Sequence, residues 1–189
     1  YQGEELGMGN YPFTDPSQFR DLESINAYQE LTEKLHISPE ELFPMIAHKS
    51  RDNARTPMQW NSEKEAGFTT GTPWISVNPN YTTVNAEEQL KRADSVFHYY
   101  QKLIALRHSS DLIVYGDFRL LLPEDPDLFV YERSLGEKKL LVVCNVSENE
   151  RDFSIPEEFK TGKLLIHNVE GEDAKRGHLL PYEAFVLEI

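Results

Sequence analysis

The densest group of side chains that could do chemistry lies in the segment 51–55, which reads Arg-Asp-Asn-Ala-Arg. A guanidinium group is planar and holds five N–H donors at fixed positions, which suits carboxylates, phosphates or vicinal hydroxyls. Pro57 breaks any helix soon afterwards, so a loop or short turn must position both arginines. Two interpretations follow: a site for an oxygen-rich ligand, or an arginine–carboxylate network that pins a long loop.

The longer stretch 51–60, Arg-Asp-Asn-Ala-Arg-Thr-Pro-Met-Gln-Trp, resembles a signature of the oligo-1,6-glucosidase and α-glucosidase group of glycoside hydrolase family 13. Further motifs similar to that group occupy residues 1–8, 21–26 and 66–81. The resemblance implies that residues 1–8 are the eighth strand of a (β/α)8 barrel and the turn after it. It also implies that the chain is the C-terminal part of a larger enzyme.

Apolar residues three and four positions apart predict an amphipathic helix over residues 21–35. Ser38, Pro39 and Glu41 predict the start of a second helix, which Pro44 should shorten or kink. Residues 50–84 contain many prolines and glycines and should form a long loop, which in a compact domain is usually functional.

Asn85 and Glu88 can cap a further helix. Its apolar stripe continues to about residue 107, so we expect a single element there, the last helix of the barrel.

Beyond residue 112 the apolar pattern becomes extended, with strands expected at 117–122, 128–134, 138–145, 151–155, 163–167 and 182–188. Short strands separated by turn residues are typical of an antiparallel β-sandwich. The predicted fold class is therefore an α+β fragment, in which residues 1–112 end a (β/α)8 TIM barrel and residues 113–189 form a C-terminal all-β sandwich domain.

The composition argues against several functions. With 32 acidic and 19 basic residues the net charge is −13, which disfavours nucleic acid or an anionic membrane surface as a partner. No stretch approaches the roughly 18 apolar residues of a membrane span. The single cysteine, Cys144, excludes an internal disulfide and fits a reducing compartment, so a cytoplasmic location is expected. The six histidines show no metal-ligand spacing. The family often carries calcium or magnesium on loops upstream of residue 1, and no metal or cofactor is expected in this chain.

Retaining glycosidases use two carboxyl groups about 5 Å apart. The family places its catalytic Asp, Glu and Asp before the eighth strand, and their motifs are absent here, so no catalytic residue is assigned and the chain alone is predicted to be inactive. By resemblance, Glu23 corresponds to a carboxylate near the leaving sugar, and Arg51 to an arginine that contacts sugar hydroxyls or the catalytic carboxylates. Arg55 is a third substrate-binding candidate. Each has a structural alternative: an exposed helix carboxylate for Glu23, an ion pair for Arg51, and for Arg55 a structural role, which is favoured.

The favoured hypothesis is part of an α-glucosidase that hydrolyses terminal α-1,6 or α-1,4 glucosidic bonds of short oligosaccharides with retention. Its partner is the oligosaccharide, bound together with the N-terminal part of the barrel. One alternative is a trehalose-6-phosphate hydrolase, in which Lys49 could serve the phosphate, although a solvated lysine is the simpler interpretation. Another is a non-catalytic carbohydrate-binding or structural module.

Overall fold

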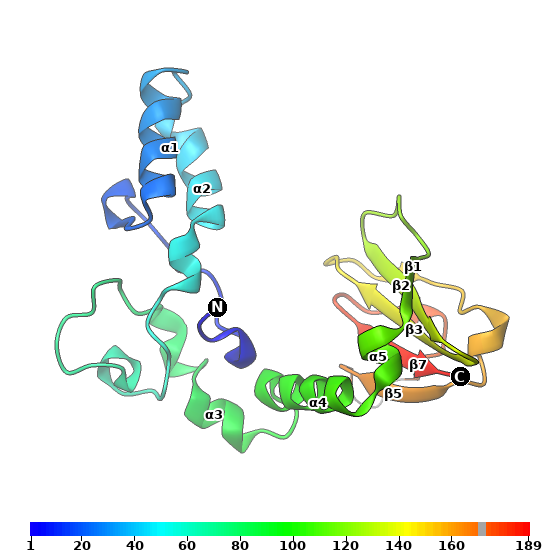
Figure 1. The fold of residues 1–189 in the computed structure, drawn as a ribbon. Helices are drawn as coiled ribbons and strands as arrows, with labels where there is room; N and C mark the ends of the chain where they lie inside the picture. Colours follow the sequence, from blue (N-terminus) through cyan, green and yellow to red (C-terminus); the bar gives the residue numbers. More distant parts are fainter. Residues whose placement is uncertain (170–172) are drawn as a thin grey trace. The chain divides into compact units, whose positions relative to one another are not determined.

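The computed structural model describes residues 1–169 and 173–189. The chain divides into two compact units, residues 1–100 and 101–189 (Figure 1). The helices are α1 (Leu22–Glu33), α2 (Pro39–Lys49), α3 (Ala86–Lys91), α4 (Val96–Ser109) and α5 (Asp111–Tyr115). The strands are β1 (Asp117–Leu120), β2 (Leu128–Leu135), β3 (Lys138–Asn145), β4 (Arg151–Asp152), β5 (Lys163–His167), β6 (His178–Leu179) and β7 (Ala184–Glu188).

In the first unit, α1 and α2 lie side by side as a helical hairpin (Figure 1). Both helices were predicted, but α2 is longer than its proline suggested and continues through Pro44 to Lys49. A proline inside a helix removes one backbone hydrogen bond. Packing along α1 and the burial of Leu42 keep the remaining turns in place. Two of the apolar residues in the α1 pattern, Leu22 and Leu35, are nevertheless exposed.

The loop predicted over residues 50–84 is present, interrupted only by short 3₁₀ helices. The Gln59 side-chain amide ties the first half of this loop to its end. That amide donates to the Asn80 side-chain oxygen at 3.0 Å and to the Val84 carbonyl at 2.5 Å. Gln59 itself is fully buried. The loop is therefore anchored by buried polar contacts rather than by regular secondary structure.

The single helix expected between residues 86 and 107 is wrong, because the structure has two. Asn85 caps α3 by accepting from the Glu88 N–H, as predicted. The backbone is then extended at Arg92, with φ −103° and ψ 117°, and α3 ends there. It re-enters a helix where the Ser95 carbonyl accepts from the Tyr99 N–H at 3.0 Å. The apolar stripe is continuous across this break, so periodicity did not reveal it.

Residues 1–8 contain no strand, although a strand end was expected. Residues Glu4–Leu6 form a 3₁₀ helix between Gly3 and Gly7, which have φ values of 78° and 71°. A strand exists only with a partner that takes up its backbone hydrogen bonds, and no described strand pairs with this segment. The barrel therefore stays a prediction.

In the second unit, β1, β2, β3, β7 and β5 form, in that order, a five-stranded sheet whose pairs are all antiparallel. Strands β4 and β6 form a separate antiparallel pair. Alternating residues of β2, β3 and β7 point into the main core with Phe159, while α5 packs against β2 and β3 on the other face. The core residues of those three strands are Leu128, Val130, Leu141, Val143, Phe185 and Leu187. Strands were found in all six predicted windows. The β-sandwich and the division at residue 112 remain predictions.

A fully buried carboxylate, Glu183, ties the turn before β7 to its surroundings. It accepts from the Leu180 N–H at 2.7 Å, from both terminal nitrogens of Arg176 at 3.1 and 2.5 Å, and from His167 Nε2 at 2.9 Å. Burial alone would raise the pKa of Glu183. The Leu180 N–H and the Arg176 and His167 side chains outweigh that effect, so the pKa lies below its ordinary value.

Replacing Glu183 with Gln should lower the free energy of unfolding of the second unit by about 2–3 kcal/mol, because a neutral amide replaces a fully buried carboxylate that accepts from Leu180, Arg176 and His167, and its NH2 group then faces donors. The measurement is urea unfolding of the chain at pH 7. Glu158→Gln, at an exposed carboxylate paired with Lys139, is the matched control and should leave the transition unchanged. An unaltered transition for Glu183→Gln would contradict the importance of this network.

The same network predicts a pH dependence. A carboxyl whose pKa is lower in the folded than in the unfolded state stabilises the fold at pH values above its unfolded pKa, near 4.5. That stability is lost as the pH falls through the lower folded pKa. The stability difference between wild type and Glu183→Gln should therefore narrow below about pH 4.5. A difference that stays constant down to pH 3 would contradict this expectation.

Candidate functional site

The structure brings two of the predicted site residues together. Glu23 lies in the first turn of α1, and Arg51 opens the 3₁₀ helix Arg51–Ala54 that follows α2. Arg51 Nη2 lies 2.7 Å from Glu23 Oε2. Because α1 and α2 pack as a hairpin, the beginning of one helix lies near the end of the other, which explains the meeting of residues 28 positions apart.

The pair is open to solvent, since the Arg51 and Glu23 side chains are 65% and 68% exposed. An exposed ion pair contributes only about 0–1 kcal/mol to stability. The remaining lone pairs of Glu23 and the other N–H groups of Arg51 can accept from and donate to hydroxyls of a ligand. The pair is thus suited to binding and contributes little to holding the fold.

Arg55 occupies a different environment. Its Nη1 lies 3.5 Å from Asp21 Oδ1 and 3.8 Å from Asp52 Oδ1, and its side chain is 43% exposed. Both aspartates are buried. Arg55 therefore supplies positive charge to two buried carboxylates, which supports the structural interpretation that the sequence favoured for it.

Asp21 caps α1 by accepting from the Ser24 N–H at 3.1 Å. Burial would raise the pKa of Asp21. The hydrogen bonds from Ser24 and the charges of Arg55 and Arg51 act in the opposite direction and hold the pKa below its usual value. Asp21 is thus kept ionised beside the candidate site. Sequence reasoning identified the helix start but not this carboxylate as its cap.

A pocket of about 150 Å³ surrounds the pair and includes Asp21, Glu23, Ser24, Lys49 and Arg51 among its lining residues. Lys49, the last residue of α2, entered the sequence analysis only through the phosphate alternative. Its place in the wall means that the pocket holds two cations as well as two carboxylates. The pocket can therefore take a polar ligand with both donors and acceptors.

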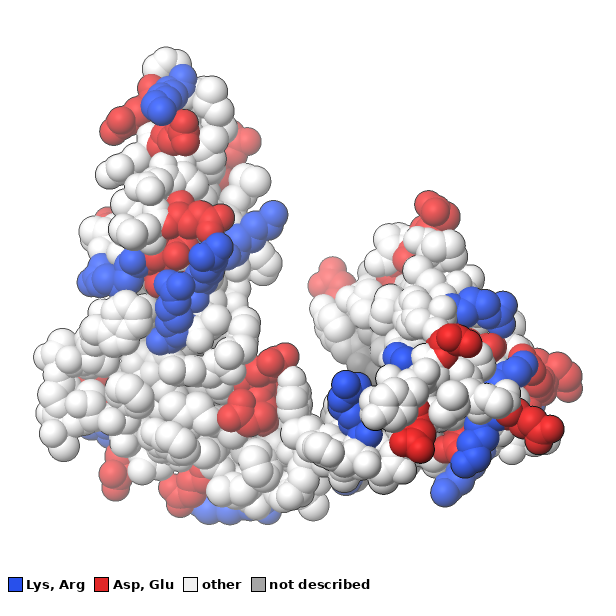
Figure 2. Space-filling view, in the orientation of Figure 1, with Lys and Arg blue, Asp and Glu red and all other residues white. Residues whose placement is uncertain are grey.

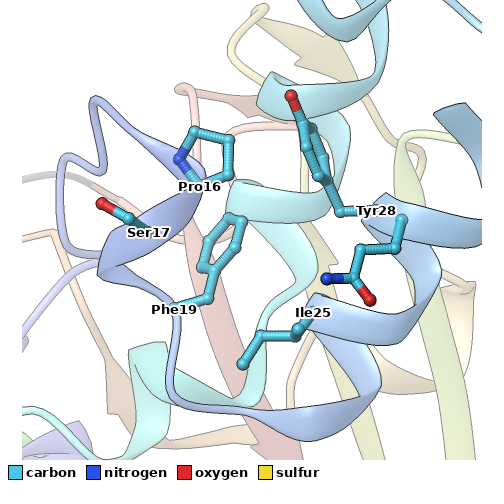
Figure 3. Close-up of a pocket in the computed structure, with 6 residues that line it drawn as sticks. Pro16, Ser17, Phe19, Ile25 and Tyr28 are labelled. Carbon is cyan, nitrogen blue, oxygen red and sulfur yellow. The ribbon is translucent and has the colours of Figure 1, made fainter.

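A second pocket, of about 320 Å³, lies between residues 16–19 and α1 (Figure 3). Its walls are Pro16, Ser17, Phe19, Ile25, Tyr28 and Gln29, and Figure 3 shows the Phe19 ring between Pro16 and Ile25. Ile25 is two residues after Glu23, about 200° around the helix, so this pocket belongs to the opposite face of α1. It contains no charged side chain, and sequence reasoning did not single it out.

On the face shown in Figure 2, lysines and arginines lie next to acidic side chains. Within residues 1–169 and 173–189, no group of three or more His, Cys, Asp or Glu side chains could hold a metal ion. Over the same residues, no helix has the length and apolar character needed to cross a membrane.

Comparison with known proteins gives consistent results. The family model for the catalytic domain of α-amylase matches residues 1–116. The oligo-1,6-glucosidase of Parageobacillus thermoglucosidasius is 47% identical over all of this chain and 34% of its own length. The trehalose-6-phosphate hydrolase of Bacillus subtilis is 42% identical, again over all of this chain and 34% of its own. The crystal structure of isomaltulose synthase from Klebsiella sp. LX3 superposes with a TM-score of 0.91 at 38% identity, covering 100% of this chain and 34% of that one.

This chain thus spans about a third of the length of the relatives it matches. Those relatives carry different activities at similar identities, from 38% to 47%. Overall likeness therefore shows the family but does not choose among these reactions, which must be argued from the site.

The geometry predicts stability effects of different size for two neighbouring carboxylates. Asp21→Ala should cost about 2 kcal/mol, because it removes a buried helix cap and a partner of Arg55. Glu23→Gln should change stability by less than about 1 kcal/mol, because its ion pair is exposed. Urea unfolding supplies the free energies, and hydrogen exchange in the first turn of α1 supplies the local readout. Equal effects of the two variants would contradict this division.

Proposed function

This chain belongs to the α-amylase family, and we propose that it is the C-terminal part of an α-glucosidase of the oligo-1,6-glucosidase group. The whole enzyme would hydrolyse terminal α-1,6 or α-1,4 glucosidic bonds of short oligosaccharides with retention of configuration. In this proposal residues 1–112 complete a (β/α)8 barrel and residues 113–189 form the C-terminal β-sandwich domain.

The observation that carries the proposal is the exposed Glu23–Arg51 pair in its pocket. A carboxylate and a guanidinium that are paired yet open to solvent form a set of donors and acceptors suited to vicinal sugar hydroxyls. We assign both residues to the leaving sugar. Arg55 completes the substrate-binding set indirectly, through the buried carboxylates Asp21 and Asp52 that it neutralises.

The nucleophile and the acid/base carboxyl belong, in this proposal, to the part of the enzyme outside this chain. The two buried aspartates beside the site do not replace them, because Asp21 caps α1 and Asp52 accepts backbone N–H groups. The chain therefore contributes binding and orientation of the sugar. It supplies no proton transfer or covalent step and requires no cofactor.

A trehalose-6-phosphate hydrolase is the second candidate, and one observation favours it. Lys49 lines the same pocket as Arg51, so two cations are available there to an anionic sugar substituent. A non-catalytic module is less well supported. Of five aromatic side chains on residues 113–189 that could form a sugar platform, four are buried or packed against the core, namely Phe159, Phe185, Phe153 and Tyr131, and only Tyr182 is exposed.

A cytoplasmic location is also part of the proposal. Its support is the single cysteine, Cys144, which is a free thiol whose pKa is raised by burial. Neither nucleic acid nor a membrane is proposed as a partner, given the net charge of −13.

The substrate test compares glucose release from isomaltose and from trehalose 6-phosphate by the whole enzyme that contains this chain. Isomaltose should be preferred, and Glu23→Gln and Arg51→Lys should each lower kcat/KM for it by tenfold or more. Glu30→Gln, at an exposed carboxylate of α1 paired with Lys34, is the control and should have no effect. Preference for the phosphorylated sugar, lost in Lys49→Met, would instead establish the second candidate.

The 189-residue chain alone should release no glucose from either disaccharide, because the paired catalytic carboxyls lie elsewhere. Measured hydrolysis by the purified chain, above that of a mock preparation, would overturn this assignment of the catalytic groups.

A further inference from the structure

The side chain of Asp52 is a fully buried charge that the proposed chemistry does not use. Its Oδ2 accepts from the backbone N–H of Arg20 at 2.6 Å and of Asp21 at 3.0 Å. These are the last two residues before α1 begins. One carboxylate oxygen thus links the N-terminal end of α1 to the 3₁₀ helix that contains Asp52.

The contact is part of a closed ring of hydrogen bonds. Asp21 accepts from the Ser24 N–H and hydroxyl, the hydroxyls of Ser24 and Ser50 lie 2.9 Å apart, and Ser50 Oγ accepts from the Asp52 N–H at 3.2 Å. Asp52 closes the ring through the Asp21 N–H. All four residues are buried, so water competes little for these bonds.

The ring fixes the backbone positions of the two site residues, Glu23 and Arg51. Glu23 lies between two ring members, Asp21 and Ser24, and Arg51 lies between the other two, Ser50 and Asp52. The Glu23–Arg51 ion pair is exposed and too weak to set its own geometry. The backbone positions from which both side chains reach the ligand are therefore set by the ring.

We propose that Asp52 is a positioning residue for substrate binding: its buried carboxylate joins the start of α1 to the 3₁₀ helix Arg51–Ala54 and so holds Glu23 and Arg51 at binding distance. The inference rests on the proposed function, in which these two side chains contact the leaving sugar. Asp52 itself touches no substrate, because its side chain is fully enclosed.

Charge and shape are both required at this position. Oδ1 of Asp52 makes no hydrogen bond and lies 3.8 Å from Arg55 Nη1. Asparagine would keep one oxygen for the two backbone N–H groups but would turn an amide toward the guanidinium, donor against donor. Asp52→Asn is therefore a near-isosteric change that weakens the ring while preserving volume.

The first test uses the whole enzyme and two substrates. Asp52→Asn should lower kcat/KM for isomaltose about tenfold and for 4-nitrophenyl α-glucoside less than about twofold, because the aryl substrate has no leaving sugar for Glu23 to contact. A parallel loss on both substrates would overturn the proposal and indicate general destabilisation. Asp94→Asn, at an exposed carboxylate paired with Arg92, is the control and should change neither value.

A double-mutant cycle separates positioning from simple stability. If Asp52 acts through Glu23, the Asp52→Asn/Glu23→Gln enzyme should be within about twofold of the more impaired single variant on isomaltose. Multiplied effects would overturn the proposal. If Asp52→Asn does not fold, Ser50→Ala interrupts the ring at another member and replaces it in both tests.

A crystal structure of the Asp52→Asn enzyme gives a readout that does not depend on activity. The expected result is longer contacts to the Arg20 and Asp21 N–H groups, because an amide oxygen is a weaker acceptor than a carboxylate, together with separation of Glu23 from Arg51. Retention of that pair at hydrogen-bond distance would overturn the proposal. If the wild-type enzyme cleaves neither disaccharide, the proposed function fails, and this structure alone decides whether Asp52 positions the pair.

Discussion

The first unit depends on one buried carboxylate that must be satisfied by a distant segment. Asp52 Oδ2 accepts two backbone N–H groups that are 32 and 31 residues earlier in the chain. An ionised group away from water is tolerated only when it is hydrogen-bonded or paired. The loop that carries Asp52 therefore has to dock against the start of α1, and the α1–α2 hairpin, the cap of α1 and the place of the signature arginines all follow from that contact.

The second unit contains a comparable arrangement. Glu183 lies just before β7, is fully buried, and accepts hydrogen bonds from Leu180, Arg176 and His167. In both units short elements meet at irregular segments that no helix or sheet ladder could hold together. Buried carboxylates can accept several bonds at once and so join such segments. The same dependence makes them sensitive to substitution, because removing one partner leaves the others buried without compensation.

Burial separates the two kinds of charge at the candidate site. Asp21 and Asp52 are enclosed and make bonds within the protein, whereas Glu23 and Arg51 face solvent and keep bonding capacity for a ligand. Along the chain, Glu23 is followed by buried Ser24, and Arg51 lies between buried Ser50 and Asp52. Glu23 and Arg51 can therefore serve binding, because the buried framework of Asp21 and Asp52 stabilises this part of the fold without them. Arg55, half-exposed beside the two aspartates, belongs to the framework.

The sequence by itself determined the elements that depend on features of neighbouring residues, such as the spacing of apolar side chains, helix caps and turn residues. These include α1, the loop over 50–84, the Asn85 cap and strands in all six predicted windows. The signature motif likewise pointed to the family that the comparison with known proteins shows. Tertiary structure decided the rest, because it depends on contacts between distant residues. Packing against α1 carried α2 past Pro44, the break at Arg92 divided one apolar stripe into two helices, and the pairing of Glu23 with Arg51 required the hairpin to form. The hydrogen-bond partners of Asp52 and Glu183 could not be predicted from the sequence for the same reason. The residue type and position of a carboxylate do not reveal which backbone N–H groups folding will bring to it.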